Sequence, residues 1–258
     1  MSVRLASEEV QGLEKAAIED IRQIRAGLPL GAAQLSLAYK ETTRGMDPES
    51  ARRALEKTRN KVSDLRVAKS TFFALANPDG TVLRNDQEQD RMAGKNLFAA
   101  FPALKRALSE PYVETRGSMP EAAEVRGRSD AQWVAAVPVK GEGGGAPLAL
   151  YATGFSWSAY AYRLENSARS NARAALKERE TLPLVYVYVV VDREVYGAPI
   201  SPEINAKVVK EQSVLDKASP GKPFTAELEI TGRSFGLAAV PAPALGERVA
   251  IAVLRSEI

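Results

Sequence analysis

The sequence contains no cysteine and no histidine among its 258 residues. These absences exclude disulfides, cysteine nucleophiles, iron–sulfur clusters, Ser-His-Asp triads and ordinary zinc sites. No carboxylate pair stands at a spacing that indicates acid–base catalysis, and Gly143-Gly144-Gly145 lacks the lysine and helix of a phosphate-binding loop. The sequence therefore predicts a protein that is not an enzyme and that uses no cofactor and no metal. Two alternatives stay open: a metal held by carboxylates alone, and an enzyme that uses only carboxylates, lysine and tyrosine, which turnover of a substrate would reveal.

Strong charge imbalance and long apolar runs are also missing. The formal net charge is +3, from 35 basic and 32 acidic residues, and no aromatic-basic recognition motif is present, so a nucleic-acid partner is not expected. No apolar run approaches the ~20 residues of a membrane span, and no signal peptide follows Met1. Taken alone, these features fit either a cytosolic protein or a soluble part of a membrane protein.

The first 70 residues have the pattern of helices. Apolar residues recur from Val10 to Leu28 at steps of three and four, which places them on one helix face. Pro29 interrupts this pattern and predicts a kink or a short break. Asp47-Pro48-Glu49 predicts the start of a second helix, which runs to about Lys69.

Short strands follow from Ser70 onward. A strand, a turn around Asp79-Gly80 and a second strand precede helical residues 92–109 and a strand near 112–115. Residues 132–139 and 148–155 then form a hairpin. If the hairpin is symmetric about Gly143, Trp133 lies opposite Thr153 and Ala135 opposite Tyr151, so Trp133, Tyr151 and Thr153 share one surface.

The β segment occurs twice, on either side of a helix predicted over residues 157–181. Ala135-Ala136-Val137-Pro138 recurs as Ala238-Ala239-Val240-Pro241, and both copies follow the order strand-strand-helix-strand-strand-strand. The first copy has about ten more residues between its second strand and its hairpin, a length that suits enclosure of a ligand. The position of Trp133 is taken by Gly236 in the second copy, which suits tighter packing.

The predicted fold class is α+β, with long N-terminal helices followed by two PAS-like antiparallel five-stranded sheets joined by a long helix. The expected divisions are a helical stalk over residues 1–70, a first sheet domain over 71–156, a connecting helix over 157–181 and a second sheet domain over 182–258.

This arrangement resembles the double-Cache sensor domains of bacterial chemoreceptors and sensor kinases. Residues 77–84 resemble the strand-turn-strand motif of that family, residues 94–97 with 101–108 resemble the helix after it, and residues 133–155 resemble its central hairpin. The order of elements extends the resemblance over nearly the whole chain.

The resemblance implies a non-enzymatic, periplasmic sensor for signal transduction, such as chemotaxis. Such domains bind a small solute in the membrane-distal first unit and pass the signal through the terminal helices. They contact the membrane only through two transmembrane helices, which this sequence does not contain. The aspartate that grips an amino group in amino-acid-binding members has no clear counterpart near Phe155-Ser156-Trp157, which favours a small carboxylate as the ligand.

A carboxylate ligand needs hydrogen-bond donors, and arginine offers a two-pronged match. The candidates are arginines near the expected pocket edge, an aromatic ring that could stack on a ligand, and three hydroxyls. The candidate ligand-binding residues are Arg84, Tyr112, Arg116, Arg126, Arg128, Trp133, Tyr151 and Thr153. Each has an ordinary alternative role, as a solvated arginine, a core tryptophan or a half-buried strand residue.

The alternative function is a helix-mediated dimerisation or interaction module. In that case the helices over residues 1–69 and 157–181 carry the function and both sheets have filled cores. Sensors of the resembled family also form homodimers through the stalk, so a dimer alone does not separate the two functions. A response to a ligand does, because a filled core gives none.

Overall fold

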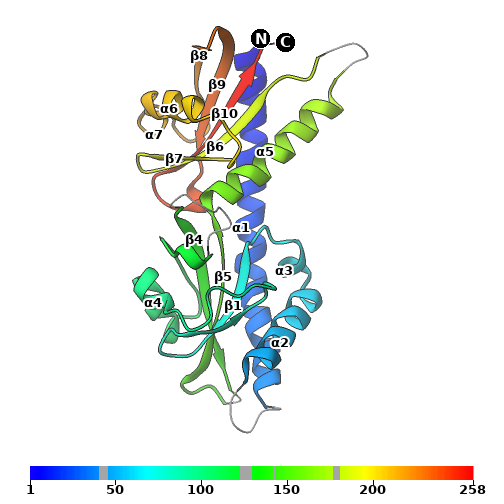
Figure 1. The fold of residues 1–258 in the computed structure, drawn as a ribbon, viewed down its shortest axis with the longest axis vertical. Helices are drawn as coiled ribbons and strands as arrows, with labels where there is room; N and C mark the ends of the chain where they lie inside the picture. The colour runs from blue at the N-terminus through cyan, green and yellow to red at the C-terminus, as the bar shows by residue number, and fades with distance from the viewer. Residues whose placement is uncertain (41–45, 123–129, 142, 177–180, 258) are drawn as a thin grey trace. The chain divides into compact units, whose positions relative to one another are not determined.

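The computed structural model describes residues 1–40, 46–122, 130–141, 143–176 and 181–257. The described chain forms two compact units. The first unit is Arg22–Ser156, and the second unit is Met1–Ile21 together with Trp157–Ile258. Each unit contains one five-stranded antiparallel sheet (Figure 1), which confirms the predicted α+β fold class.

The N-terminal helix α1 spans Ser2–Lys40 and contributes to both units. Its buried residues recur at the predicted steps of three and four: Ala6, Val10, Leu13, Ala17, Ile21, Ile24, Leu28, Ala32 and Leu35. The helix continues through Pro29 without a break (Figure 1), so the short break that the sequence allowed is absent. Pro29 removes one backbone hydrogen bond, but burial of Leu28 and Ala32 on either side holds the helical path.

In the first unit, two further α-helices precede the first strand in the sequence, and short helices lie between later strands. In chain order these elements are α2 (Pro48–Lys61), α3 (Ser63–Val67), β1 (Phe72–Ala76), β2 (Val82–Asn85), α4 (Leu97–Ala100), the 3-10 helix η1 (Pro102–Leu108), β3 (Val113–Gly117), the 3-10 helix η2 (Pro120–Ala122), β4 (Gln132–Lys140) and β5 (Pro147–Ser156). The strand order is β2-β1-β5-β4-β3. The predicted start of α2 is confirmed, because the Asp47 carboxylate accepts hydrogen bonds from the backbone N–H groups of Glu49 and Ser50, both at 3.0 Å.

The hairpin of β4 and β5 has a different register from the predicted one. Trp133 lies opposite Phe155, and Thr153 lies opposite Ala135. The pairing shifts between Val139 and Lys140, a bulge that the symmetric prediction did not include. The error is two residues, and an even shift leaves each side chain on its predicted face, so Trp133, Tyr151 and Thr153 do share one surface.

The second unit repeats the topology of the first. After the first half of α1 its elements are α5 (Trp157–Ala174), β6 (Val185–Val191), β7 (Glu194–Gly197), α6 (Glu203–Glu211), α7 (Val214–Lys217), β8 (Phe224–Ile230), β9 (Arg233–Pro241), the 3-10 helix η3 (Pro243–Leu245) and β10 (Val249–Ser256). The strand order β7-β6-β10-β9-β8 matches that of the first sheet. The two Ala-Ala-Val-Pro segments lie on β4 and β9, which hold equivalent places, so the internal repeat is confirmed.

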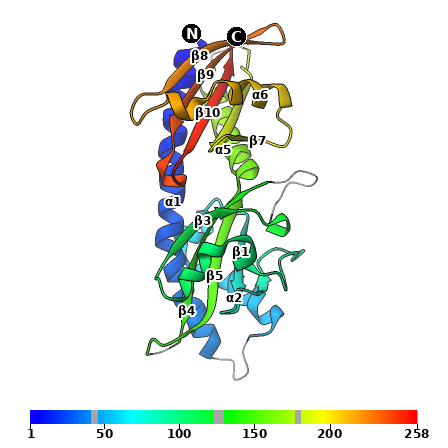
Figure 2. The same cartoon turned by 90° about the vertical axis from the view of Figure 1, so that its left-hand side faces the viewer.

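Close packing in the second unit explains one difference between the repeats. A Cβ atom added to Gly236 would collide with the backbone of Ser2 and Val3 at the start of α1. Glycine at this position, in place of Trp133, therefore lets α1 approach the second sheet. The Ser2 hydroxyl also lies 3.4 Å from the Glu257 carboxylate, and Figure 2 shows both chain ends at one end of this unit.

Candidate functional site

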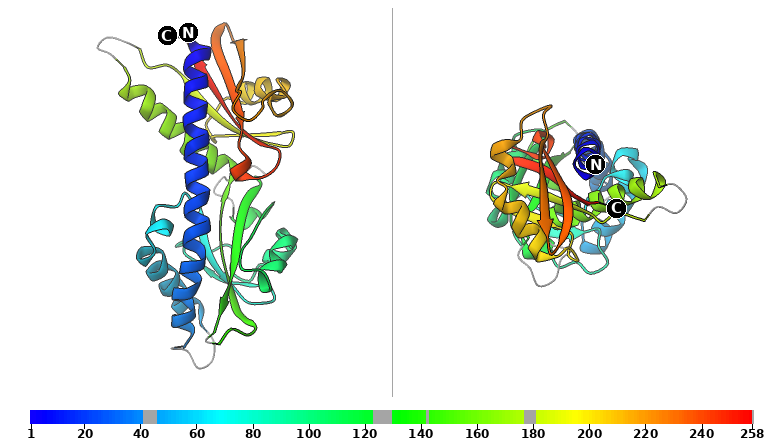
Figure 3. Two further views of the ribbon diagram at one scale, coloured as in Figure 1. Left: turned by 180° about the vertical axis from the view of Figure 1, so that it is seen from behind. Right: turned by 90° about the horizontal axis from the view of Figure 1, so that it is seen from above.

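The two faces of the first sheet are covered by different helices. On one side, the α1 face, a Cβ atom added to Gly31 of α1 would lie 2.6 Å from the Tyr151 ring. On the other, the α4 face, α4 and η1 pack against alternate residues of the same strands. Figure 1 and the left view in Figure 3 show the sheet between α1 and the α4 segment.

The α4 face is densely packed within the described residues. Small side chains of β1, β4 and β5 are covered by larger ones from the segment between β2 and β4. The buried members of this cluster are Phe72, Ala74, Ala76, Val82, Met92, Leu97, Phe101, Leu104, Ala107, Val113, Met119, Ala122, Val134, Ala136, Leu150 and Ala152. The longer first copy thus supplies α4, η1 and η2 as a cover for the sheet. Residues 123–129 of that segment, with the candidates Arg126 and Arg128, lie outside the described residues.

Three candidates form the packed middle of the α1 face. Trp133 is 1% exposed and stacks on Phe155, with ring centroids 5.2 Å apart. Tyr151 is fully buried, stacked on Phe73 at 6.0 Å, and burial raises the pKa of its hydroxyl. The Thr153 hydroxyl donates a hydrogen bond to the carbonyl of Phe72 at 2.7 Å. Each of these side chains is engaged in packing or bonding inside the unit.

Two further candidates lie at the β3 edge of the sheet. Arg116 stands opposite Trp133 in the β3–β4 ladder, so its side chain also belongs to the α1 face. The Tyr112 hydroxyl donates to the Glu114 carboxylate at 3.0 Å, and that carboxylate also receives two hydrogen bonds from Arg25 of α1, at 2.7 and 3.2 Å. The hydrogen bond to Glu114 raises the pKa of Arg25, and burial raises the pKa of Tyr112. This bonded trio fastens α1 to the edge of the sheet.

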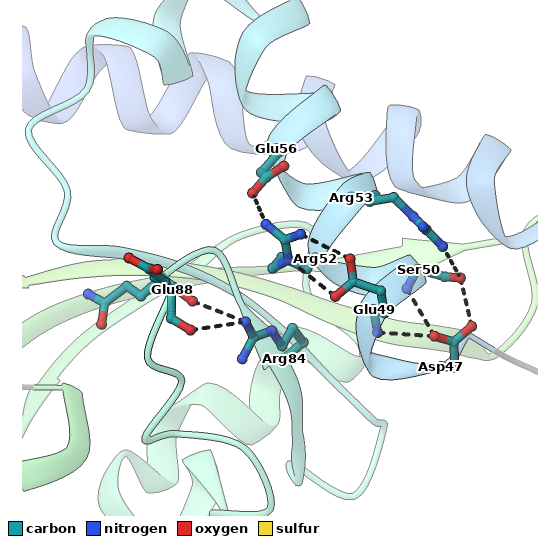
Figure 4. A network of polar contacts seen from close by, with 9 residues as sticks. Asp47, Glu49, Ser50, Arg52, Arg53, Glu56, Arg84 and Glu88 are labelled. Carbon is teal, nitrogen blue, oxygen red and sulfur yellow. Dashed lines mark hydrogen bonds and ion pairs between the residues drawn. The ribbon is translucent and has the colours of Figure 1, made fainter.

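Arg84 lies at the opposite edge, on β2 (Figure 4). Its guanidinium donates to the backbone carbonyls of Gln87 and Glu88, at 3.2 and 3.5 Å, and lies 3.4 Å from the buried carboxylate of Asp90. The arginine therefore closes the loop that follows β2. Its side chain is 17% exposed.

Figure 4 also shows the first turns of α2 near Arg84. Arg52 bridges Glu49 and Glu56, at 2.9 and 2.6 Å, and the hydrogen bond from Arg52 lowers the pKa of Glu49. The pKa of Asp47 is lowered by its hydrogen bond from the Ser50 hydroxyl. Glu49, Arg52 and Glu56 are therefore paired within the helix. Arg84 is the one arginine of this cluster that lies on a strand.

The strand order separates the candidates into two groups. Arg84 on β2 and Arg116 on β3 are four strand spacings apart, which at roughly 4.8 Å per spacing is about 19 Å. A small carboxylate cannot span that distance. The structure thus places Arg116 opposite Trp133, leaves Tyr112 four residues before Arg116 at the same edge, and separates Arg84 from all three.

An open groove of about 400 Å³ lies on the α1 side of the first unit. Its lining is mostly apolar and consists of Pro29, Ala32, Ala33, Ser36, Pro111, Val137, Pro138 and Lys140. The Ser36 hydroxyl donates to the Lys140 carbonyl at 2.6 Å, which ties α1 to the end of β4. Sequence reasoning missed this groove because it depends on the pairing of distant segments. Pro29, Val137 and Pro138 were noted for other reasons, and none of the described candidate ligand-binding residues lines the groove.

In the described part of the chain, no group of three or more acidic side chains is arranged to hold a metal ion. No described helix is both long enough and apolar enough to cross a membrane.

Comparisons with known proteins identify the fold. No protein-family profile matches the chain, and no curated protein matches it in sequence. Among solved structures, it is similar to a domain of a sensory box/GGDEF family protein from Vibrio parahaemolyticus, with a TM-score of 0.60 and 12% identity over 99% of this chain and 96% of that chain.

Two further solved structures extend the comparison. The ligand-binding domain of the Pseudomonas aeruginosa amino acid chemoreceptor PctC, in complex with GABA, gives a TM-score of 0.52 and 15% identity over 97% of each chain. An extracellular ligand-binding receptor from Desulfohalobium retbaense gives 0.54 and 12% over 96% of this chain. The present chain spans 39% of the length of that receptor. The chain therefore has the fold of the double-Cache-type sensor domains, as the sequence resemblance predicted.

Proposed function

We propose that the chain is the ligand-binding sensor domain of a signalling receptor, of the chemoreceptor or sensor-kinase type. The observation that carries this proposal is the pair of sheets with identical strand order that share one continuous helix, α1. This fold is also that of the chemoreceptor domain and the extracellular receptor described above. The domain acts by binding a solute rather than by catalysis.

We further propose an extracytoplasmic location. The termini of the second unit lie side by side, as the contact between Ser2 and Glu257 indicates. This arrangement suits a domain whose two ends lead toward the same membrane face. Ligand binding would then shift an existing equilibrium between two arrangements of the terminal segments, and it does so only if the ligand binds one arrangement more tightly.

The finer proposal is that the ligand is a small carboxylate bound at the β3 edge of the first unit. Two features support this position. Arg116 supplies a guanidinium on the α1 face at this edge, and the groove beside Pro111 offers space on the same side of the unit. Lys140 adds positive charge at the groove. Trp133, Tyr151 and Thr153 form the packed wall behind the site.

The experiment compares two arginines of one sheet. Binding of a panel of small carboxylates is measured by calorimetry for the unaltered chain, for Arg116→Gln and for Arg84→Gln. Loss of a charge-assisted hydrogen bond weakens binding about tenfold or more, so we expect that loss for Arg116→Gln and unchanged affinity for Arg84→Gln. The reverse result would refute the β3-edge site and leave the sensor function standing.

A second candidate function is self-association through α1, favoured by one specific feature. Ala26, Leu30, Ala33 and Leu37 are exposed at spacings of four, three and four residues, the pattern of a two-helix seam. Leu30 is 56% exposed and Leu37 is 51% exposed. The occupant that fits this seam is the α1 helix of a second copy, because an isologous contact pairs the same stripe with itself.

Sedimentation analysis tests this candidate. Leu30→Glu would place a charge in the seam, and we expect the dimer to dissociate at concentrations where the unaltered chain is dimeric. Ile204→Glu, on α6 and 43% exposed at the start, is the matched control and should leave association unchanged. A chain that stays monomeric at high concentration, or a dimer indifferent to Leu30→Glu, would count against the seam.

A further inference from the structure

The second unit contains a cavity of about 260 Å³ where β6 and β7 meet α6 and α7. Its interior is lined by aliphatic side chains from four elements: Val190, Val195, Val209, Val214 and Leu215. Val209 and Val214 are buried and belong to the core of this unit. The cavity therefore has a rigid hydrocarbon floor anchored in the core.

Charged side chains surround the mouth of this cavity, and most of them are paired. Lys210 lies 3.0 Å from the Glu194 carboxylate. Arg248 lies 3.3 Å from Asp192. Arg193 also lines the mouth, and it makes no ion pair with any residue in the described part of the chain. One guanidinium is thus available to a ligand at the edge of an apolar cavity.

The backbone around the mouth is held in an uncommon conformation. Asp192, Ser213 and Arg248 have φ angles of 55°, 49° and 54°, and all three line the cavity. Among the described residues only Thr231 is a further non-glycine residue with positive φ. The Asp192 N–H donates to the Arg248 carbonyl at 2.9 Å, which fixes the turn that carries Arg193. Such conformations persist where neighbouring contacts hold them, and they are enriched at binding sites.

We propose that this cavity binds a small aliphatic carboxylate, with its hydrocarbon part on the valine and leucine floor and its carboxylate paired with Arg193. The volume lies just below the 300 Å³ or so at which pockets for larger ligands begin, so the ligand is a short one. An apolar floor with a few polar or charged groups at its edge is the usual composition of such sites. The second unit would then receive its own input, independent of any site in the first unit.

Calorimetry with isovalerate tests the proposal on the whole chain. We expect saturable binding that Arg193→Gln weakens about tenfold, since the variant loses the charge-assisted pair. Arg233→Gln, an exposed arginine at the start of β9 and outside the cavity lining, is the matched control and should bind as the unaltered chain does. The neutral analogue isovaleramide should bind more weakly than isovalerate.

Methyl NMR of a valine- and leucine-labelled chain locates the ligand. Addition of isovalerate should shift the methyl signals of Val195, Val214 and Leu215. Absence of binding at millimolar isovalerate would overturn the proposal, as would equal binding by Arg193→Gln. Binding lost in Arg116→Gln but kept in Arg193→Gln would place isovalerate in the first unit and would also overturn it, without touching the sensor function.

Discussion

At the scale of single residues, the most informative group is Glu165, a fully buried glutamate on α5. Its carboxylate accepts hydrogen bonds from the Val187 N–H at 3.1 Å and the Ser201 hydroxyl at 3.4 Å, and it lies 2.7 Å from Arg169. One side chain thereby joins α5 to β6 and to the segment after β7. Burial nevertheless raises the pKa of Glu165, because the loss of hydration exceeds what these partners restore.

The raised pKa predicts how stability varies with pH. The folded chain holds the Glu165 proton at pH values where the unfolded chain has released it, so this contribution is fully present below the ordinary glutamate value of about 4.3 and is lost as the pH rises through the folded value. Urea unfolding across this pH range should show the unaltered chain losing stability relative to Glu165→Gln as the pH rises. Glu227 is an exposed residue on β8, and the stability of Glu227→Gln should change with pH in the same way as that of the unaltered chain. A difference between Glu165→Gln and the unaltered chain that does not change with pH would disprove the assignment.

At the scale of elements, α1 packs against the first sheet through a glycine contact. A Cβ atom at Gly31 would lie 2.6 Å from the Tyr151 ring and 2.9 Å from Leu65 of α3. Both side chains are fully buried, so neither can move away at low cost. The absence of a side chain at Gly31 therefore sets the distance between α1 and the sheet.

Two glycines of the same helix give a matched pair of variants. Gly31→Ala should lower stability by about 1 to 3 kcal/mol through overpacking, and its melting temperature should fall. Gly12→Ala meets nothing within 4 Å and should raise stability by about 0.5 to 1 kcal/mol, because alanine loses less backbone entropy. Melting temperatures measured side by side check both. Equal stability of the two variants would mean that Gly31 is not a close contact.

Local sequence signals predicted most elements of the fold. The strand and turn patterns, the Asp47 cap and the Ala-Ala-Val-Pro repeat gave both sheets with their correct strand count. Pro29 was misread, because a local rule about proline does not include the burial of Leu28 and Ala32 against other elements. The hairpin register was misread because a bulge depends on the paired strand as well as on the turn.

The site was less predictable than the fold. The shared face of Trp133, Tyr151 and Thr153 followed from alternation along the strands. The helix that covers that face could not be predicted from alternation, because it depends on packing between α1 and the sheet. The separation of Arg84 from Arg116 follows from strand order, which sequence alone did not place. The cavity of the second unit is lined by residues of four elements and of the loops beside them, which no local sequence pattern brings together.

At the scale of the whole molecule, the repeated unit is the main feature. The two sheets have the same topology but different side chains at equivalent positions. Trp133 of the first sheet corresponds to Gly236 of the second, where α1 passes close to the sheet. The two units therefore present different side chains on equivalent faces. The proposals for the β3 edge and for the cavity near Arg193 assign one site to each unit. Each proposal can be tested independently of the other.

Binding of a small solute is the property on which the proposed sensor function depends most. A thermal-shift screen of the chain against small carboxylates, amino acids, sugars and polyamines at millimolar concentration tests for such binding directly. A ligand at 100 times its dissociation constant adds about 2.7 kcal/mol of stability, which for a chain of this size raises the melting temperature by about 5 to 10 °C. We predict a rise of this size confined to one chemical class, the small carboxylates. An unchanged melting temperature across the whole panel, together with concentration-dependent self-association, would contradict the sensor function and would favour the interaction module.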